Sequence, residues 1–178
     1  LEGDINSNLQ TVQGMVAIIS VEPDITQSRF GAYASVLLQD RSLLKNIGGA
    51  PDMVIRYIYP LQGNEGALGL NLGKNPAQRQ AAMSARDSKD MVIAGPLKLV
   101  QGGNGIIGRI PVFVEQNGQR TFWGLVSAVI DADLLFKRNG LLDAEVLYAI
   151  SIRGKDGLGA KGAVFFGAAE LFDQNPVL

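Results

Sequence analysis

The chain has 178 residues, enough for one compact domain or two small subdomains with a hydrophobic core. Hydrophobic residues make up 47% and charged residues 19%, which excludes intrinsic disorder as the main state. The 16 basic and 17 acidic residues nearly balance, so the sequence carries no overall basic surface for nucleic acid. The absence of histidine and cysteine excludes zinc and haem on their usual ligands, and since a hard metal on oxygen ligands has no clear motif either, no cofactor and no metal site is predicted.

The first quarter of the chain is predicted to be helical. Over residues 4–20 the apolar side chains follow a helical period, at Ile5, Leu9, Val12, Val16 and Ile19. This stripe has two interpretations, a seam between two copies of the chain or a face that packs onto a sheet. A second helical stripe begins after Thr26 and is expected to end near Gly48 and Gly49.

The middle of the chain is predicted to form an antiparallel sheet. Residues 53–59 are rich in β-branched and aromatic side chains, which indicates a first strand. Asn75 and Pro76 then predict the start of a short helix over residues 77–87. Four further strands are expected, and the Asn117-Gly118 pair predicts a tight hairpin turn between the last two. These strands cover residues 91–94, 97–100, 106–114 and 121–130.

The last third of the chain predicts a second, smaller group of strands. Residues 131–138 suit a short helix, residues 145–153 and 162–166 suit strands, and a turn is expected at 155–157. The fold class is therefore α+β. The most apolar windows run for only seven residues, far short of the roughly 20 that a membrane span needs. The start at Leu1 and the apolar end favour a fragment of a longer protein.

Five blocks of sequence resemble the CHASE sensory domain. In chain order they are YPLQGNE at residues 59–65, LGLNL at 68–72, NP at 75–76 with ARDS at 85–88, AGPLKLVQGG at 94–103, and GRIPVF at 108–113. Their order and spacing agree with the family, most strongly between residues 54 and 129.

The resemblance implies a periplasmic ligand sensor held between two transmembrane helices that lie outside this chain. Its output would be a histidine kinase, a nucleotide cyclase or a diguanylate cyclase. Family members have a long N-terminal helical stalk followed by two PAS-like antiparallel sheets. Residues 1–50 would be the stalk and covering helices, residues 51–130 the membrane-distal subdomain with the ligand pocket, and residues 131–178 a truncated membrane-proximal subdomain. The expected partner is a second copy of the chain, bound through the N-terminal helix.

Site residues are also implied by the resemblance. Plant members of the family bind cytokinin through an Asp, a backbone segment and a Thr, and these positions fall here on Asn71, on residues 97–99 and on Arg109. The segment 97–99 consists of Leu97, Lys98 and Leu99. Asn in place of Asp removes a charge, and Arg in place of Thr adds a guanidinium, so the resemblance favours a small anionic ligand over an adenine-like one.

The residues themselves leave some alternatives open. Arg109 lies in an otherwise apolar strand, where it could bind a ligand carboxylate, form an internal salt bridge or face outward. Tyr57 and Tyr59 share a strand face and could wall the pocket or belong to the core. Ser127 could lie on the pocket floor with Trp123, and Asn71 is equally typical of a turn.

Two other classes of function were weighed. An enzyme could draw only on Glu65, Asp87 and Lys98 near the expected pocket, and no pair of carboxylates has a spacing that specifies general acid and base, so no enzymatic activity is predicted. The alternative to a sensor is a structural or protein-interaction module without a small-molecule ligand. In such a module Arg109 would be paired internally.

Overall fold

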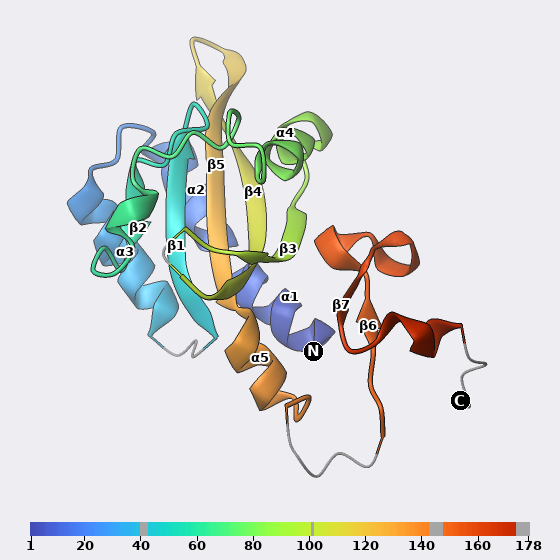
Figure 1. The fold of residues 1–178 in the computed structure, drawn as a ribbon. Coiled ribbons are helices and arrows are strands. Elements are labelled where there is room, and N and C mark those ends of the chain that lie inside the picture. The colour runs from blue at the N-terminus through green and yellow to red at the C-terminus, as the bar shows by residue number, and fades with distance from the viewer. Residues whose placement is uncertain (40–42, 101, 143–147, 174–178) are drawn as a thin grey trace.

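A five-stranded antiparallel sheet forms the centre of the molecule (Figure 1). The computed structural model describes residues 1–39, 43–100, 102–142 and 148–173. The strand order is β2-β1-β5-β4-β3, and every neighbouring pair is antiparallel. The strands are β1 (Leu44–Pro51), β2 (Tyr57–Tyr59), β3 (Val92–Lys98), β4 (Asn104–Gln116) and β5 (Gln119–Asp131). The expected α+β fold, with N-terminal helices followed by a PAS-like antiparallel sheet, is confirmed.

The long hairpin of β4 and β5 is the most extensive pairing in the sheet. Its turn consists of Asn117 and Gly118, which have φ angles of 52° and 73°. Two successive positive φ angles give the backbone a twist that matches the flanking strands, and Asn and Gly adopt them at low cost. The predicted hairpin is therefore confirmed.

Three helices cover one face of the sheet (Figure 1): α1 (Glu2–Thr11), α2 (Gln13–Val21) and α3 (Gln27–Leu38). The helix predicted over residues 4–20 is divided at Val12, whose backbone N–H donates to Leu9 in a tighter turn. Leu9, Val12 and Ile19 of the apolar stripe have no exposed surface and belong to the main core. The stripe therefore packs onto the sheet within the chain.

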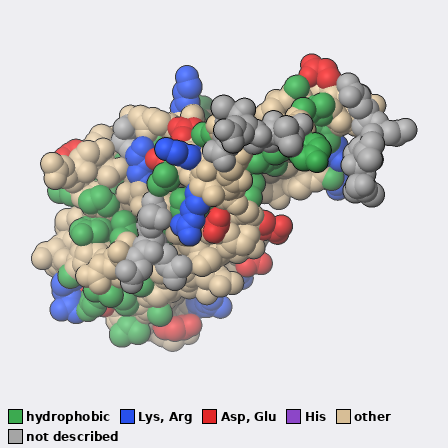
Figure 2. All heavy atoms as spheres, turned by 90° about the horizontal axis from the view of Figure 1, so that it is seen from below, with side chains coloured by type: hydrophobic (Ala, Val, Ile, Leu, Met, Phe, Trp, Pro, Cys, Tyr) green, Lys and Arg blue, Asp and Glu red, His purple; other side chains and the backbone are tan. Residues whose placement is uncertain are grey.

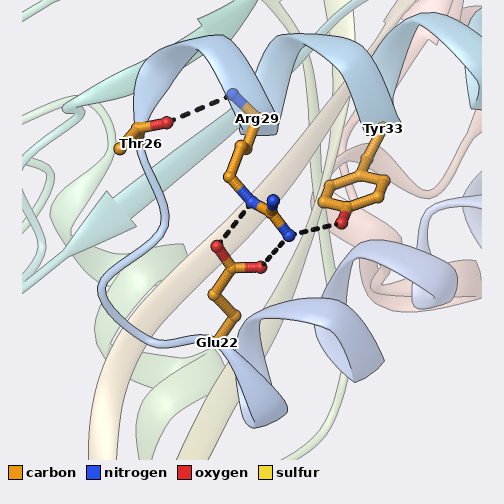
Figure 3. A network of polar contacts seen from close by, with 4 residues as sticks. All are labelled: Glu22, Thr26, Arg29 and Tyr33. Carbon is orange, nitrogen blue, oxygen red and sulfur yellow. Dashed lines mark hydrogen bonds and ion pairs between the residues drawn. The ribbon is translucent and has the colours of Figure 1, made fainter.

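The turn between α2 and α3 is fixed by a polar network at the surface (Figure 3). Thr26 begins α3, its hydroxyl oxygen accepting a hydrogen bond from the Arg29 backbone N–H at 3.3 Å. The Arg29 guanidinium pairs with the Glu22 carboxylate at 2.6 Å and donates to the Tyr33 hydroxyl at 2.9 Å. The hydrogen bond to Glu22 raises the pKa of Arg29 above its ordinary value. This arginine is exposed and its charge is matched.

One predicted helix ends earlier than expected. The second helical stripe was expected to reach Gly48 and Gly49, but α3 ends at Leu38 and residues 44–51 form β1 between β2 and β5. The glycines do not cap a helix; Gly49 makes room for aromatic rings, because a Cβ added to it would lie 2.9 Å from Phe30. The neighbouring strand is also shorter than predicted, since only Tyr57–Tyr59 of residues 53–59 forms β2.

The opposite face of the sheet is covered by α4 (Arg79–Ser88), the short 3-10 turn η1 (Glu65–Ala67) and the loop between them. The side chain of Asn75 accepts a hydrogen bond from the Ala77 N–H at 3.1 Å, as its capping position predicts, but the regular helix starts only at Arg79. Ala82 and Ala85 of α4 are buried against the sheet with Leu125 of β5.

After β5 the chain forms α5 (Ala132–Arg138), which begins where Asp131 accepts a hydrogen bond from the Leu134 N–H at 2.9 Å. A small unit with a two-stranded sheet of β6 (Ile152–Arg153) and β7 (Val164–Phe166) follows, so the expected second strand group is confirmed. Residues 145–147 of the predicted strand 145–153 lie outside the described residues. The unit also contains the 3-10 turns η2 (Lys155–Gly157), η3 (Gly159–Lys161) and η4 (Ala169–Phe172).

The β6–β7 unit projects from the rounded main body (Figures 1 and 2). Phe136 of α5 joins the two parts, because its ring lies 5.2 Å from that of Phe166 and 6.2 Å from that of Phe165. On the face drawn in Figure 2 basic and acidic side chains are interspersed, as the balanced composition predicts. Within the described residues no helix is both long and apolar enough to cross a bilayer.

Candidate functional site

A cavity lies between the sheet and the segment that covers it on the side opposite α1 to α3. Its floor is formed by residues of β1, β4 and β5, and its cover by the chain from residue 55 to residue 78 together with residues 99 and 100. The space inside is about 450 Å³ including the open mouth, and the inner part is narrow, with room for a few waters. An organic ligand larger than a few waters must therefore extend into the open mouth or displace part of the cover.

The sheet register brings the floor residues together. Gly48 of β1 is paired with Ser127 of β5, which is paired in turn with Arg109 of β4. These three residues form one row across three strands, and the next row consists of Asn46, Val129 and Ile107. Because side chains in one row point to the same face, the register places Ser127 and Arg109 side by side on the cavity floor. Gly48 leaves the space beside Ser127 open.

Arg109 is the most unusual residue of the cavity. It is 1% exposed, and it is the largest of the fully buried side chains. Its terminal Nη2 donates a hydrogen bond to the side-chain oxygen of Gln78, which is a neutral acceptor. Its Nε and Nη1 atoms have no hydrogen-bond partner, and no ion pair to Arg109 is found in the described part of the chain.

The charge of Arg109 is therefore poorly compensated. Burial lowers the pKa of its guanidinium from the ordinary 12.5 to about 10, while the more distant Asp156 carboxylate acts in the opposite direction. The side chain still carries its positive charge at neutral pH. The exposed Arg29 offers a direct contrast, because it has a carboxylate partner and is surrounded by solvent. A buried cation whose donors are unfilled has both the charge and the free N–H groups that an anion requires.

The cover of the cavity is tied to the sheet by buried amides. The Asn46 side-chain NH₂ donates to the side-chain oxygen of Asn64 at 2.8 Å, and Asn64 in turn donates to the Pro60 carbonyl at 3.0 Å. Both asparagines are buried. Gln78 is attached to the floor through Arg109 at the other end of the same segment. The cover is thus held at both ends by neutral hydrogen bonds.

Three of the eight predicted ligand-binding residues line this cavity, namely Arg109, Leu99 and Ser127. Leu97 packs behind Leu99 without lining the cavity, and Lys98 is exposed. Asn71 occupies a turn, where its side-chain oxygen accepts a hydrogen bond from the Lys74 N–H at 3.0 Å. The side chain of Asn71 therefore hydrogen-bonds within its own turn, as expected of a residue typical of turns.

Tyr57 and Tyr59 lie on the opposite face of the sheet from the cavity. The ring of Tyr57 stacks between Phe30 and Trp123, with centroid distances of 5.5 Å and 6.4 Å. The ring of Tyr59 packs against α3, where it would touch a Cβ placed on Gly31. Between them, Ile58 points into the cavity. Trp123, once expected on the cavity floor, donates its indole N–H to the Pro23 carbonyl at 2.9 Å on the helical side.

Sequence reasoning missed most of the cavity wall. Gln78 carries no motif of its own and reaches Arg109 only through the fold of the loop. A correct register for β1 would have identified Gly48 and Asn46, because Gly48 is paired with Ser127 and Asn46 with Val129 on the same face of the sheet. The other missed residues are aliphatic or small: Ile55, Ile58, Ala67, Leu70, Leu72, Val100, Ile107 and Val129.

The side chains weighed for catalysis do not meet at the cavity. Glu65, Asp87 and Lys98 are all exposed and none lines it. Asp87 forms a surface ion pair with its neighbour Arg86 at 2.7 Å. Over the described ranges, acidic residues do not gather in groups that could hold a metal ion.

Comparisons with known proteins agree with this architecture. The CHASE domain family matches residues 48–166, which include every lining residue of the cavity except Asn46, together with strands β6 and β7. No curated protein sequence matches the chain. Among solved structures, an extracellular ligand binding receptor from Desulfohalobium retbaense DSM5692 has a TM-score of 0.64 at 17% identity, covering 78% of this chain. The match spans only 24% of that receptor.

A second solved structure with the same fold is the ligand binding domain of the amino acid chemoreceptor PctC from Pseudomonas aeruginosa PAO1, in complex with GABA. Its TM-score is 0.57 at 14% identity, with 90% of this chain and 74% of that domain covered. At identities this low the matches establish a shared fold.

Proposed function

The chain belongs to the CHASE domain family of extracytoplasmic sensor domains, and on that premise we propose that it binds a small organic anion in the cavity over Arg109. Binding would be relayed to a cytoplasmic kinase or cyclic-nucleotide output domain of a transmembrane receptor. The domain itself performs no catalysis. It lies in the periplasm, anchored by membrane helices that flank it in the whole receptor.

The observation that carries this proposal is the unfilled hydrogen-bonding capacity of Arg109. A guanidinium that is 1% exposed and has two unpartnered donor atoms is unfavourable unless an anion joins it. Its position on the floor of a cavity gives that anion a place. The chemoreceptor domain of similar fold is in complex with GABA, an amino acid, and its carboxylate is the group that such a ligand has in common with the anion proposed here.

The same observation disfavours the alternative of a purely structural module. In such a module Arg109 would be neutralised by a carboxylate within the chain. Its hydrogen-bond partner is instead the neutral amide of Gln78, and Asp156 acts on it only from a distance.

A route for the relay leads from the cavity to the β6–β7 unit. Val92 of β3 is paired with Arg109, and three residues further along β3 the Gly95 N–H donates to the Asp156 carboxylate at 2.7 Å. Asp156 belongs to η2 in the β6–β7 unit. The sheet subdomain would be membrane-distal and residues 131–178 membrane-proximal, so that β3 connects the ligand to the membrane side.

We further propose that the receptor acts as a homodimer through its N-terminal helices. Because Leu9, Val12 and Ile19 are buried inside the chain, the interface would use the outward face of α2, where Val21 is 88% exposed. The molecular mass in solution, measured at increasing protein concentration, shows whether the domain dimerises. A strict monomer at all concentrations would remove the support for a dimer of the isolated domain.

A thermal-shift screen tests the proposed sensing function. A ligand that binds the folded state raises the melting temperature by mass action, so organic acids, amino acids and purines are compared on the intact chain. We expect stabilisation by acids, its loss in Arg109→Met, and its retention in Arg79→Met, which changes an exposed arginine of α4. Stabilisation by a purine that survives Arg109→Met, or by no compound at all, would contradict the proposal.

A further inference from the structure

The composition of the cavity wall restricts its ligand further. Its polar side chains are Asn46, Gln78, Arg109 and Ser127, and none of the lining residues is acidic or aromatic. All other lining residues are aliphatic or glycine. The wall therefore has one positive charge, a few neutral hydrogen-bonding groups and an otherwise apolar surface.

The guanidinium of Arg109 can still bind a carboxylate with two hydrogen bonds. Gln78 accepts from Nη2, which has two N–H groups, and Nε and Nη1 are both without partners. A carboxylate can bind a guanidinium either at the Nε and Nη2 edge or at the Nη1 and Nη2 edge. Gln78 uses one N–H of Nη2, so one of these two edges keeps both of its parallel N–H groups. One carboxylate on that edge would give the Arg109 charge an anionic partner.

A ligand ammonium group would find no such partner. An ammonium needs a carboxylate or several oxygen acceptors once it is removed from water. Among the described residues the wall offers no carboxylate, the side-chain oxygen of Gln78 already accepts a hydrogen bond from Arg109, and only the neutral side-chain oxygens of Asn46 and Ser127 remain as side-chain acceptors. A purine or other aromatic ring would likewise find no aromatic side chain to stack on.

We propose that the cavity is selective for a short aliphatic monocarboxylate that carries no ammonium group. The carboxylate would bind Arg109, and the hydrocarbon part would contact the aliphatic cover formed by Ile55, Ile58 and Leu70. The narrow interior limits the chain length, since a longer tail must displace the cover. This inference rests on the proposed sensing function and specifies its ligand class.

Three compounds with the same branched carbon skeleton test the inference on the wild-type chain. Isovalerate has the carboxylate alone, valine adds an ammonium group, and isovaleramide replaces the carboxylate by a neutral amide. Titration calorimetry measures each affinity. We expect isovalerate to bind at least about tenfold more tightly than either of the others. Isovaleramide loses the charge-assisted hydrogen bonds to Arg109, and valine brings an ammonium group that stays unpaired in the cavity.

Variants connect the selectivity to the arginine. Arg109→Met should weaken isovalerate binding by about tenfold or more, and Arg109→Lys should recover only part of it because a lysine cannot form the two-bond fork. The exposed Arg79→Met should leave the affinity unchanged. The comparison of the three compounds needs no variant and holds even if Arg109→Met does not fold.

The outcomes separate this inference from the sensing function. Valine binding as tightly as isovalerate would overturn the selectivity and leave an anion sensor in place. Equal binding of isovaleramide would overturn the role of the carboxylate. If none of the three compounds binds but another acid from the screen does, the aliphatic ligand class is wrong; if no small molecule binds, both proposals fail.

Discussion

Replacing Arg109 by methionine should stabilise the chain in the absence of ligand, although the residue is almost fully buried. Burial lowers the pKa of the guanidinium from 12.5 to about 10. At 1.36 kcal/mol per pKa unit, keeping the charge in the folded state costs about 3 kcal/mol at neutral pH. The substitution also removes the hydrogen bond to Gln78, whose loss costs about 1–2 kcal/mol. The net gain is about 1–2 kcal/mol.

The predicted gain can be measured by thermal unfolding. For a chain of this size 1 kcal/mol corresponds to about 2–4 °C, so the melting temperature should rise by about 2–8 °C. The exposed Arg79→Met should change the stability by less than about 0.5 kcal/mol. Adding Gln78→Leu to Arg109→Met should stabilise further, because it removes the acceptor that the first substitution leaves unpaired.

The pH dependence of this gain follows from the direction of the pKa shift. Below the folded-state pKa of about 10 the guanidinium is protonated in both the folded and the unfolded state, so it lowers the free energy of unfolding by a constant amount. As pH rises from about 10 toward 12.5 the folded state loses the proton first, and the contribution disappears. The difference between wild type and Arg109→Met should therefore be flat from about pH 6 to about pH 9. Destabilisation of about 3–5 kcal/mol by Arg109→Met would refute the reasoning, because that is the effect of breaking a buried ion pair.

Other substitutions test the parts of the fold that position the cavity and its relay. Gly124→Ala should destabilise the chain by about 3 kcal/mol or more, since a Cβ there would lie 2.1 Å from a carbonyl oxygen of β1. Gly3→Ala, where a Cβ meets no atom within 4 Å, should leave the stability unchanged, and equal midpoints of the two variants in chemical denaturation would contradict this. Trp123→Phe should lower stability by about 1 kcal/mol through loss of its indole hydrogen bond, and an unchanged midpoint would show that bond to be neutral. Asp156→Ala should increase hydrogen exchange at the Gly95 amide, and unchanged protection there would disconnect the β6–β7 unit from β3.

Local signals in the sequence predicted much of the fold. The Asn117-Gly118 turn, the start of α5 at Asp131 and the helix that follows Asn75 depend on backbone preferences within a few residues, and these were identified correctly. The β1 strand was mistaken for the end of a helix because its two glycines resemble a helix cap. Gly49 instead admits the ring of Phe30, a contact that the sequence pattern does not contain, and Gly48 borders the cavity.

The candidate site was predicted only where an anomaly was visible in the sequence itself. An arginine inside an apolar strand drew attention to Arg109, and its buried, unmatched charge is the main feature of the cavity. The face of a strand is harder to assign. Tyr57 and Tyr59 alternate with Ile58, and a choice of the wrong face places the tyrosines in the pocket and the isoleucine outside it. Gln78 was beyond prediction because a loop brings it to the sheet.

The same unmatched charge sets the scale of any signal that the domain can send. A ligand shifts a conformational equilibrium only by the difference in its affinity for the two states. If an anion relieves most of the roughly 3 kcal/mol associated with burying Arg109, and does so in one arrangement of β3 and Asp156 only, the equilibrium moves by about 100-fold. That is enough to turn a ten-to-one preference into its reverse. An arginine already neutralised within the chain would leave the anion little to relieve, so the incomplete pairing of Arg109 is what makes a switch of this size possible.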